Sequence, residues 1–476
     1  MPPVVTTAAG RPVCLSHFGS CPAPSPAPAG TTISTYTHFD MSFDELNTSA
    51  RYNCWGFTFI PRRYCICDEL SVDYVLEDNC IPVADGSVEQ GDIIRYRNSG
   101  ITTHTGRVWE TDGSGHATII RSKWGRMQEL FHPPLTVPVS YGSDTAYFRQ
   151  NHPLNGVADL WIRDSPTDDG EQFSHNPWWT SPDILVDVSP YDSIPDPNPK
   201  FSQVNRIWTR IQNRSDLAAP NVYVRYYWAD PAAGLPPAAW NLIPGTPAHP
   251  NPAGPFAVPG HGIVDAPYVE WTPTAAPAHQ CLLAIAYVND DPADSDNPDP
   301  IVYPFDVPWE NNVGQRNVHI INPGKKGSLH KLSIGIANPF PHLGPYDGEI
   351  QTVLTQATHL PLLSPSGKME RMPDIQFNLN KKTAISIKPA TAVDKNTFRT
   401  MFRRPPMHPS ETPLAMKNFT DIRFDPKKPQ TLDMDITIPD DAKPGSIYYL
   451  HILQKSKNQV MGGYTVVITV KEPEPK

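Results

Sequence analysis

The stretch Tyr52-Asn53-Cys54-Trp55-Gly56-Phe57 places a cysteine at the head of a short, mostly apolar run. Proline disfavours helix interiors, so Pro61 ends the run and a short helix is expected over residues 54–59. The unpaired amides and the dipole at a helix start lower the pKa of a thiol placed there. Cys54 is therefore either a candidate nucleophile or a buried apolar side chain among its aromatic neighbours.

A histidine that could act as the base for this thiol follows later in the chain. Gly91-Asp92-Ile93-Ile94-Arg95-Tyr96 leads into Thr103-His104-Thr105-Gly106-Arg107-Val108. Many thiol hydrolases combine a cysteine at the start of a helix with a histidine on a later strand, because the imidazole activates the thiol. The order of these motifs predicts that Cys54 and His104 meet in one active site.

These motifs resemble the papain-like superfamily that includes the NlpC-type and CHAP-type hydrolases. The matching pieces are Asn53-Cys54-Trp55-Gly56, Gly91-Asp92-Ile93 and His104-Thr105-Gly106. The resemblance implies an α+β papain-like domain over residues 31–152 and catalysis by Cys54 and His104. The patterns inside this domain predict helices at residues 42–46 (a capping-box start), 54–59 and 73–79, and strands at 92–97, 105–110 and 117–122.

A third catalytic residue would orient the imidazole, and the resembled families carry it on the strand after the histidine. Here that strand offers Ser122 and Lys123, and a charged lysine cannot accept the imidazole N–H. His132 and Ser122 are equal candidates, with His116 behind them, and a backbone carbonyl or a water is a further alternative. Asp92 is expected to fix a turn.

The oxyanion hole would use the Cys54 backbone amide and one further donor. Trp55, Trp124 and Tyr141 are candidate substrate-binding aromatics, or else ordinary core side chains. The chain has no glycine-rich phosphate loop and no His-Glu-x-x-His motif, so no cofactor and no metal are expected. The acidic run over residues 289–299 is better explained as a solvated loop than as a calcium site, because it lacks the EF-hand pattern.

The rest of the chain is expected to be all-β. Its 56 prolines disfavour long helices, and tryptophan and tyrosine are plentiful, so the chain should be mostly β. Residues 1–30 are expected to form a Pro/Ala-rich arm. Period-two alternation predicts a β-sandwich over residues 157–313 and another over residues 314–476, and both are expected to be immunoglobulin-like. The alternation is clearest in two sets of residues: Ile207, Thr209 and Ile211, and Leu432, Met434 and Ile436.

The segment 157–313 also resembles bacterial immunoglobulin-like, CARDB-type modules found beside extracellular hydrolases. The pieces that carry this resemblance are Ala158-Asp159-Leu160-Trp161-Ile162, Ile211-Gln212-Asn213-Arg214 and Asn221-Val222-Tyr223-Val224. It implies binding or spacing rather than chemistry. The run Ser174-His175-Asn176-Pro177-Trp178-Trp179 offers either a stacking surface for a glycan or protein partner, or aromatic packing at a domain junction.

The seven cysteines leave at least one thiol unpaired in a monomer, and Cys54 is the candidate for it. Cys65 or Cys67 could bridge to Cys80, and Cys14 to Cys21, whereas in a reducing compartment all would be thiols. A zinc site built from Cys65, Cys67 and Cys80 lacks the usual spacer and a fourth ligand.

The net charge of −10 argues against sequence-independent nucleic-acid binding, which needs a basic face. We see no apolar run long enough to span a membrane and no N-terminal secretion signal. The expectation is a protein that is cytoplasmic before export and is secreted or injected by a non-classical route.

The resemblance implies a thiol hydrolase that cleaves an amide bond, with peptidoglycan stem peptide as the favoured substrate. Such an enzyme would be a cell-wall hydrolase or an antibacterial toxin, with sandwich domains for targeting. Two alternatives stay open. One is a cysteine protease or deamidase that acts on a protein partner. The other is a non-catalytic adhesion or structural protein that keeps only the hydrolase fold.

Overall fold

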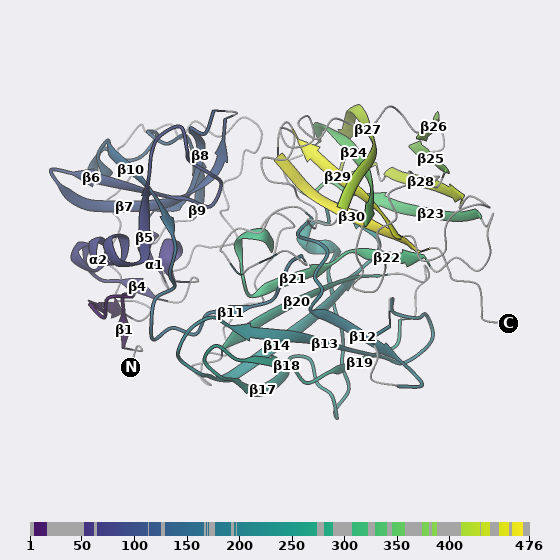
Figure 1. Ribbon diagram of the computed structural model, residues 1–476, viewed down its shortest axis with the longest axis horizontal. Helices are drawn as coiled ribbons and strands as arrows, with labels where there is room; N and C mark the ends of the chain where they lie inside the picture. Colours follow the sequence, from purple (N-terminus) through teal and green to yellow (C-terminus); the bar gives the residue numbers. More distant parts are fainter. Residues whose placement is uncertain are drawn as a thin grey trace. The chain divides into compact units, whose positions relative to one another are not determined.

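The structure, a computed structural model, describes residues 4–16, 52–60, 64–112, 114–124, 129–165, 168, 170, 177–191, 195–196, 198–273, 280–288, 307–321, 329–339, 345–357, 374–379, 383–387, 411–428, 430–437, 447–456 and 459–469. Within these residues the fold is mostly β, as the proline content predicts (Figure 1). The α-helices among them are α1 (Cys54–Phe59) and α2 (Glu69–Asn79). Neither has the length and the apolar character that crossing a membrane requires.

The chain divides into two compact units. The N-terminal unit contains Met1–Leu160, Gln212–Pro220 and Ala257–Ile263, and the C-terminal unit contains Trp161–Ile211, Asn221–Phe256 and Val264–Lys476. The two segments predicted as separate sandwiches, 157–313 and 314–476, thus lie largely within one compact unit. Strand β21 (Val313–Arg316) runs across the predicted border between them and pairs with β20 (Cys281–Val288).

The N-terminal unit is built on one antiparallel sheet of six strands. Its order is β5 (Cys80–Val83), β10 (Asp144–Gln150), β6 (Ile93–Asn98), β7 (Ile101–Thr111), β8 (Ala117–Lys123) and β9 (Glu129–His132). The predicted strands at 92–97, 105–110 and 117–122 are confirmed, but β7 begins four residues earlier than predicted. The reason is a tight turn at Ser99 and Gly100, both with positive φ, which closes a hairpin and pairs Asn98 with Ile101.

The two helices pack against this sheet, and both contact its central strand β7 (Figure 1). Helix α1 has the bounds that the sequence predicts. Helix α2 begins at Glu69 rather than at residue 73, because the Asp68 side chain caps it by accepting a hydrogen bond from the Ser71 amide at 2.7 Å. The helix predicted at residues 42–46 lies outside the described residues.

The beginning of the predicted Pro/Ala-rich arm is folded. Strand β1 (Val5–Thr6) pairs with β2 (Pro12–Val13), and β3 (Leu15–Ser16) pairs with β4 (Cys65–Ile66). Val5 and Val13 are buried in the same apolar cluster as residues of α2. The removal of these side chains from water stabilises the folded segment. Residues 17–30, which hold the proline-rich run, lie outside the described residues.

The C-terminal unit contains the remaining sheets, in which β15–β23 and β22–β30 are parallel pairs and β14–β20, β20–β21, β24–β29 and β29–β30 are antiparallel pairs. The bounds of its first strands are β11 (Leu160–Trp161), β12 (Ile184–Val188), β13 (Asn205–Asn213), β14 (Ala219–Ala229), β15 (Ala232–Ala233), β16 (Asn241–Leu242), β17 (Ala253–Val258), β18 (Ile263–Asp265) and β19 (Val269–Trp271). The later strands are β22 (Val318–Ile321), β23 (Leu329–Ile336), β24 (Tyr346–Ala357), β25 (Asp374–Leu379), β26 (Thr383–Ile387), β27 (Glu411–Phe424), β28 (Gln430–Thr437), β29 (Ile447–Ser456) and β30 (Gln459–Thr469). Short 3₁₀ turns lie at η1 (Val139–Tyr141), η2 (Pro237–Ala239) and η3 (Val307–Trp309).

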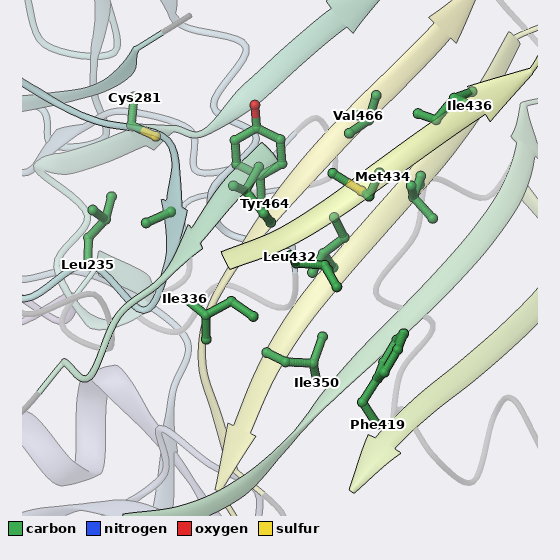
Figure 2. Packing of buried hydrophobic residues seen from close by; sticks show 14 of the residues in the cluster. Leu235, Cys281, Ile336, Ile350, Phe419, Leu432, Met434, Ile436, Tyr464 and Val466 are labelled. Atoms are coloured by element: carbon green, nitrogen blue, oxygen red, sulfur yellow. The ribbon is translucent and has the colours of Figure 1, made fainter. Parts of the chain in front are cut away.

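The period-two prediction for this unit is confirmed by burial. Ile207, Thr209 and Ile211 on β13 are fully buried, whereas the residues between them are half-buried. The sheet β15-β23-β28-β25-β26 and the sheet β22-β30-β29-β24-β27 enclose one apolar core. Figure 2 shows Leu432, Met434 and Ile436 of β28 in this core beside Tyr464 and Val466 of β30.

Candidate active site around Cys54

Cys54 is the first residue of α1 and is buried in the N-terminal unit. The residue before it, Asn53, fastens this end of the helix. The Asn53 Oδ1 atom accepts from the Gly56 amide at 2.9 Å and from the Ile66 amide at 3.3 Å. The Asn53 Nδ2 atom donates to the Ile66 carbonyl oxygen at 2.8 Å. The start of α1 is thus tied directly to strand β4.

The packing around position 56 requires a glycine two residues after the cysteine. A Cβ atom at this position would lie 1.9 Å from the Tyr64 carbonyl oxygen, which is backbone and cannot swing aside. Only glycine therefore lets α1 approach the chain at Tyr64 this closely. The Asn-Cys-Trp-Gly motif is a packing requirement as well as a candidate catalytic one.

The Cys54 sulfur lies near backbone amides and is buried away from solvent. Burial raises the pKa of the Cys54 thiol to about 12, against the opposing effect of hydrogen bonds from the Thr105 and Trp55 amides and from its own amide. The positive charge of Lys123 also favours the thiolate. In this resting structure Cys54 is therefore a protonated thiol.

His104 lies inside β7, next to the Thr105 whose amide reaches the Cys54 sulfur. Its ring is fully buried and stacks on the Tyr141 ring, with centroids 4.1 Å apart and an angle of 7° between the planes. Neither ring nitrogen has a hydrogen-bond partner among the described residues. Burial, with a smaller contribution from His132, holds the pKa of His104 well below its usual value, so the imidazole is neutral.

Cys54 and His104 lie in the same part of the N-terminal unit, because the amide of Thr105, which directly follows His104, lowers the pKa of the Cys54 thiol. Tyr141 lies against His104, and the charge of a Cys54 thiolate raises the pKa of the Tyr141 hydroxyl, after burial as the main cause. Tyr141 therefore lies close to both residues.

The two candidate orienting residues bond to each other rather than to His104. The Ser122 hydroxyl and His132 Nε2 are 2.8 Å apart, and His132 Nδ1 lies 2.8 Å from the Pro133 carbonyl oxygen. A carbonyl only accepts, so Nδ1 carries the proton and the Ser122 hydroxyl donates to Nε2. Trp124 Nε1 donates to the Ser122 oxygen at 3.1 Å. Neither Ser122 nor His132 is therefore placed as the hydrogen-bonding orienter that the sequence suggests.

The other predicted residues have different environments. His116 is exposed and pairs with Asp85 at 2.8 Å, and this contact raises its pKa. The half-buried Trp55 packs beside the apolar cluster near α1 and α2. Asp92 accepts from the Glu89 amide at 2.8 Å and forms a two-bond ion pair with Arg149, so its predicted role in fixing a turn is confirmed.

A buried charged network beside the site is absent from the sequence-based expectations. Glu129 Oε1 accepts from the Tyr52 hydroxyl at 2.7 Å, and Glu129 Oε2 accepts from Arg121 Nε at 2.9 Å. The Lys123 ammonium lies 4.6 Å from the centre of the Tyr52 ring and is fully buried. The register of the hairpin places Lys123 opposite Glu129, so two opposite charges face each other. No pattern in the sequence predicts this pairing.

The cysteine pairings proposed from the sequence are wrong. Cys14, Cys54, Cys67 and Cys80 have free thiols, and Cys80 is packed inside the apolar cluster of the N-terminal unit. Cys65 is disulfide-bonded, and its partner lies outside the described residues. Within the described ranges, no group of three or more His, Cys, Asp or Glu side chains is arranged to hold a metal ion.

No family model matches the sequence, and no curated protein is similar to it. Three solved structures illustrate how distant its structural similarities are. AvmM, which catalyses macrocyclization in alchivemycin A biosynthesis, has 7% identity and a TM-score of 0.19 over 34% of this chain and 86% of its own. The enterotoxigenic Escherichia coli adhesin CfaE (mutant G168D) has 8% identity and a TM-score of 0.17 over 67% of this chain and 95% of its own. A putative membrane-anchored protein from Corynebacterium diphtheriae has 9% identity and a TM-score of 0.16 over 83% and 87%. Similarity at this level assigns neither a fold family nor a function.

Proposed function

We propose that the N-terminal unit is a cysteine-dependent hydrolase of the papain-like, NlpC/CHAP type that cleaves an amide bond. The observation that carries the proposal is the meeting of two elements. The Thr105 amide acts on the Cys54 sulfur and lowers the pKa of this thiol. The residue before Thr105 is His104, a buried histidine whose ring nitrogens have no hydrogen-bond partner among the described residues. A buried imidazole in this condition is costly for the fold, which is expected where it serves chemistry.

In this proposal Cys54 is the nucleophile and His104 the base. The sulfur attacks the carbonyl carbon of the amide while the thiol proton passes to an imidazole nitrogen. The backbone amide of Cys54 supports the negative oxygen of the tetrahedral intermediate. His104 then gives its proton to the leaving amine as the C–N bond breaks and a thioester remains. Water, deprotonated by His104, hydrolyses the thioester and restores the thiol.

The pKa directions shape this mechanism. Burial raises the pKa of Cys54 and lowers that of His104, so the resting pair is a neutral thiol and a neutral imidazole. The proton is therefore transferred as the substrate binds and reacts, and not beforehand. Lys123 favours the developing thiolate, because its charge already counteracts the effect of burial on Cys54.

The substrate class follows from the sequence resemblance. Peptidoglycan stem peptide is the favoured substrate, as for a cell-wall hydrolase or an antibacterial toxin, and a protein substrate is the alternative. The C-terminal unit would then serve for targeting through immunoglobulin-like sandwiches. Its two sheets around one apolar core are consistent with that role.

A second candidate function is a non-catalytic adhesion or structural protein. The observation that favours it is the complete burial of His104 together with the raised pKa of Cys54, as in a packed core. The two candidates predict different reactivity for Cys54. If Cys54 is a nucleophile, it should be alkylated faster than an inert buried thiol. If Cys54 only fills the core, it should be alkylated no faster than such a thiol.

Cys80 provides a matched control for this test. It is a free, buried cysteine of the same unit, and burial raises its pKa to about 12, as for Cys54. We expect Cys54→Ala and His104→Ala each to lower hydrolysis of purified peptidoglycan or of a synthetic tetrapeptide stem by about a hundredfold or more, whereas Cys80→Ala leaves it unchanged. If a thiol-selective electrophile labels Cys54 no faster than Cys80, the hydrolase proposal must be given up.

A further inference from the structure

Two free cysteines, Cys14 and Cys67, face each other at the end of the strand pair β3–β4. In this antiparallel pair Leu15 lies opposite Ile66, and Ser16 lies opposite Cys65. The ladder continues one position further, because the Cys67 amide donates to the Cys14 carbonyl oxygen at 3.0 Å. The register therefore places Cys14 directly across from Cys67.

The register places the two side chains on the same face of the strand pair. Directly opposed residues of an antiparallel pair point to the same face, with Cβ atoms about 4.5–5.5 Å apart. Small adjustments bring such a pair within the Cβ separation of a disulfide, about 3.5–4.5 Å. The interaction with the Cys67 thiol is the largest cause of the raised pKa of Cys14. Cys14 is exposed and Cys67 is half-buried, so a redox reagent can reach the pair.

We propose that Cys14 and Cys67 are a dithiol–disulfide site and that their bond reversibly ties residues 4–16 to strand β4. The oxidant is a small disulfide such as oxidised glutathione. One thiolate of the pair attacks a glutathione sulfur and releases one glutathione. The second thiolate then attacks the mixed disulfide and releases the other. In balance, two cysteine thiols and one glutathione disulfide give one protein disulfide and two glutathione thiols.

The other described thiols do not compete for this role. Cys54, Cys80 and Cys281 are each buried, and none of them lies opposite another free cysteine in a described strand pair. Strand β4 already takes part in one disulfide through Cys65, two residues before Cys67. Cys67 therefore lies directly after a strand that already carries an oxidised cysteine.

The bond would act close to the candidate active site. Cys67 directly follows Ile66, whose amide and carbonyl are both held by the Asn53 side chain. Asn53 in turn precedes Cys54 and caps α1. A Cys14–Cys67 disulfide thus fixes the strand to which the start of α1 is tied. The effect on catalysis rests on the proposed hydrolase function, but the disulfide itself does not.

The test is disulfide mapping of the full chain. The protein is equilibrated with graded ratios of reduced to oxidised glutathione, quenched with acid, alkylated, digested without reduction and analysed by mass spectrometry. We expect a bond between Cys14 and Cys67, assigned by fragmentation of the joined peptides, in addition to the disulfide of Cys65. The oxidised protein should be two hydrogen atoms lighter than the protein in reduced glutathione. Cys14→Ser and Cys67→Ser should each abolish this bond and this mass difference while the Cys65 disulfide persists, and Cys80→Ser should leave both unchanged.

A second measurement examines the mechanical consequence without any activity assay. Amide hydrogen exchange at residues 64–67 should slow by about tenfold on oxidation in the wild type and stay constant in Cys14→Ser. The proposal is overturned if both thiols are still alkylated when the glutathione is almost fully oxidised, or if Cys67 is found joined to another cysteine. Because neither readout uses hydrolysis, failure of the hydrolase proposal would leave this result unaffected, and the reverse also holds.

Discussion

Asn53 binds both backbone groups of Ile66, donating to its carbonyl oxygen at 2.8 Å and accepting from its amide at 3.3 Å. The same side chain caps α1 by accepting from the Gly56 amide at 2.9 Å. One buried amide side chain therefore joins the helix that carries Cys54 to the strand that leads to Cys67.

Asn53→Ala should destabilise the protein by about 2–4 kcal/mol. The variant loses a helix cap, which contributes about 1 kcal/mol, and leaves buried backbone groups of Ile66 unsatisfied at about 1–3 kcal/mol. Urea unfolding measures the change. Asn53→Asp keeps the acceptor but not the donor, so it should lie between the wild type and the alanine variant. Equal stability of Asn53→Ala and wild type would contradict the role assigned to this residue.

Gly56→Ala should cost about 3 kcal/mol or prevent folding, because the new Cβ would lie 1.9 Å from the Tyr64 carbonyl oxygen. Gly10→Ala is the matched control. A Cβ at Gly10 meets no atom within 4 Å, and the positive φ of 81° alone costs about 1–2 kcal/mol. Thermal unfolding of both variants separates collision from backbone strain, and a larger effect at Gly10 would be inconsistent with the close approach of α1.

Stability should fall as the pH drops from about 6.5 toward 4 because of His132. Burial lowers the pKa of this histidine to about 4 from its usual 6.5, so the unfolded chain binds a proton in this interval and the folded chain does not. The unfolded state then gains protons first, and stability decreases with falling pH by up to about 3 kcal/mol.

The check is urea unfolding at several pH values for wild type and His132→Gln. The variant should show the smaller loss between pH 6.5 and 4. His116→Gln is the opposing control, since the pKa of the exposed His116 is raised by Asp85 and its contribution is lost as the pH rises. Identical pH profiles for wild type and His132→Gln would show that His132 is not buried neutral.

Glu129→Gln should destabilise the N-terminal unit by about 3 kcal/mol, because it leaves the buried Arg121 charge without its carboxylate at 2.8 Å. The double variant Arg121→Met with Glu129→Leu should recover part of that loss, since it no longer buries Arg121 without its carboxylate, whereas Tyr52 still loses its acceptor. Chemical denaturation of the single and double variants measures this difference. A double variant as unstable as the single one would mean that packing, and not charge, sets the cost.

Lys123→Met should slow alkylation of Cys54 and move its pH–rate profile to higher pH. The Lys123 charge lowers the pKa of the Cys54 thiol, so its removal leaves the effect of burial less opposed. The measurement is the rate of iodoacetamide modification at Cys54 from pH 7 to 10, followed by mass spectrometry, with Cys80 as the internal reference. An unchanged ratio of the two rates would remove Lys123 from the site.

Local structure could be predicted from the sequence wherever one short pattern decides it. The bounds of α1 follow from Asn53 and Pro61, and the alternation in β13 follows from a sheet with one buried face. The sequence patterns do not predict the early start of β7 and of α2, because a Ser-Gly turn and an Asp68 cap outweigh the weaker patterns around them. Each of these features depends on residues within a few positions of one another.

The sequence by itself determined that the chain is mostly β and that a cysteine begins a short helix ahead of a histidine strand. Only the tertiary structure decided that Cys54 and His104 are both buried and neutral, that Ser122 bonds to His132, and that Cys14 lies opposite Cys67. The physical reason is that burial and strand register arise from residues far apart in the chain. The pKa of a thiol, or the partner of a cysteine, is therefore not encoded in the spacing of its own motif.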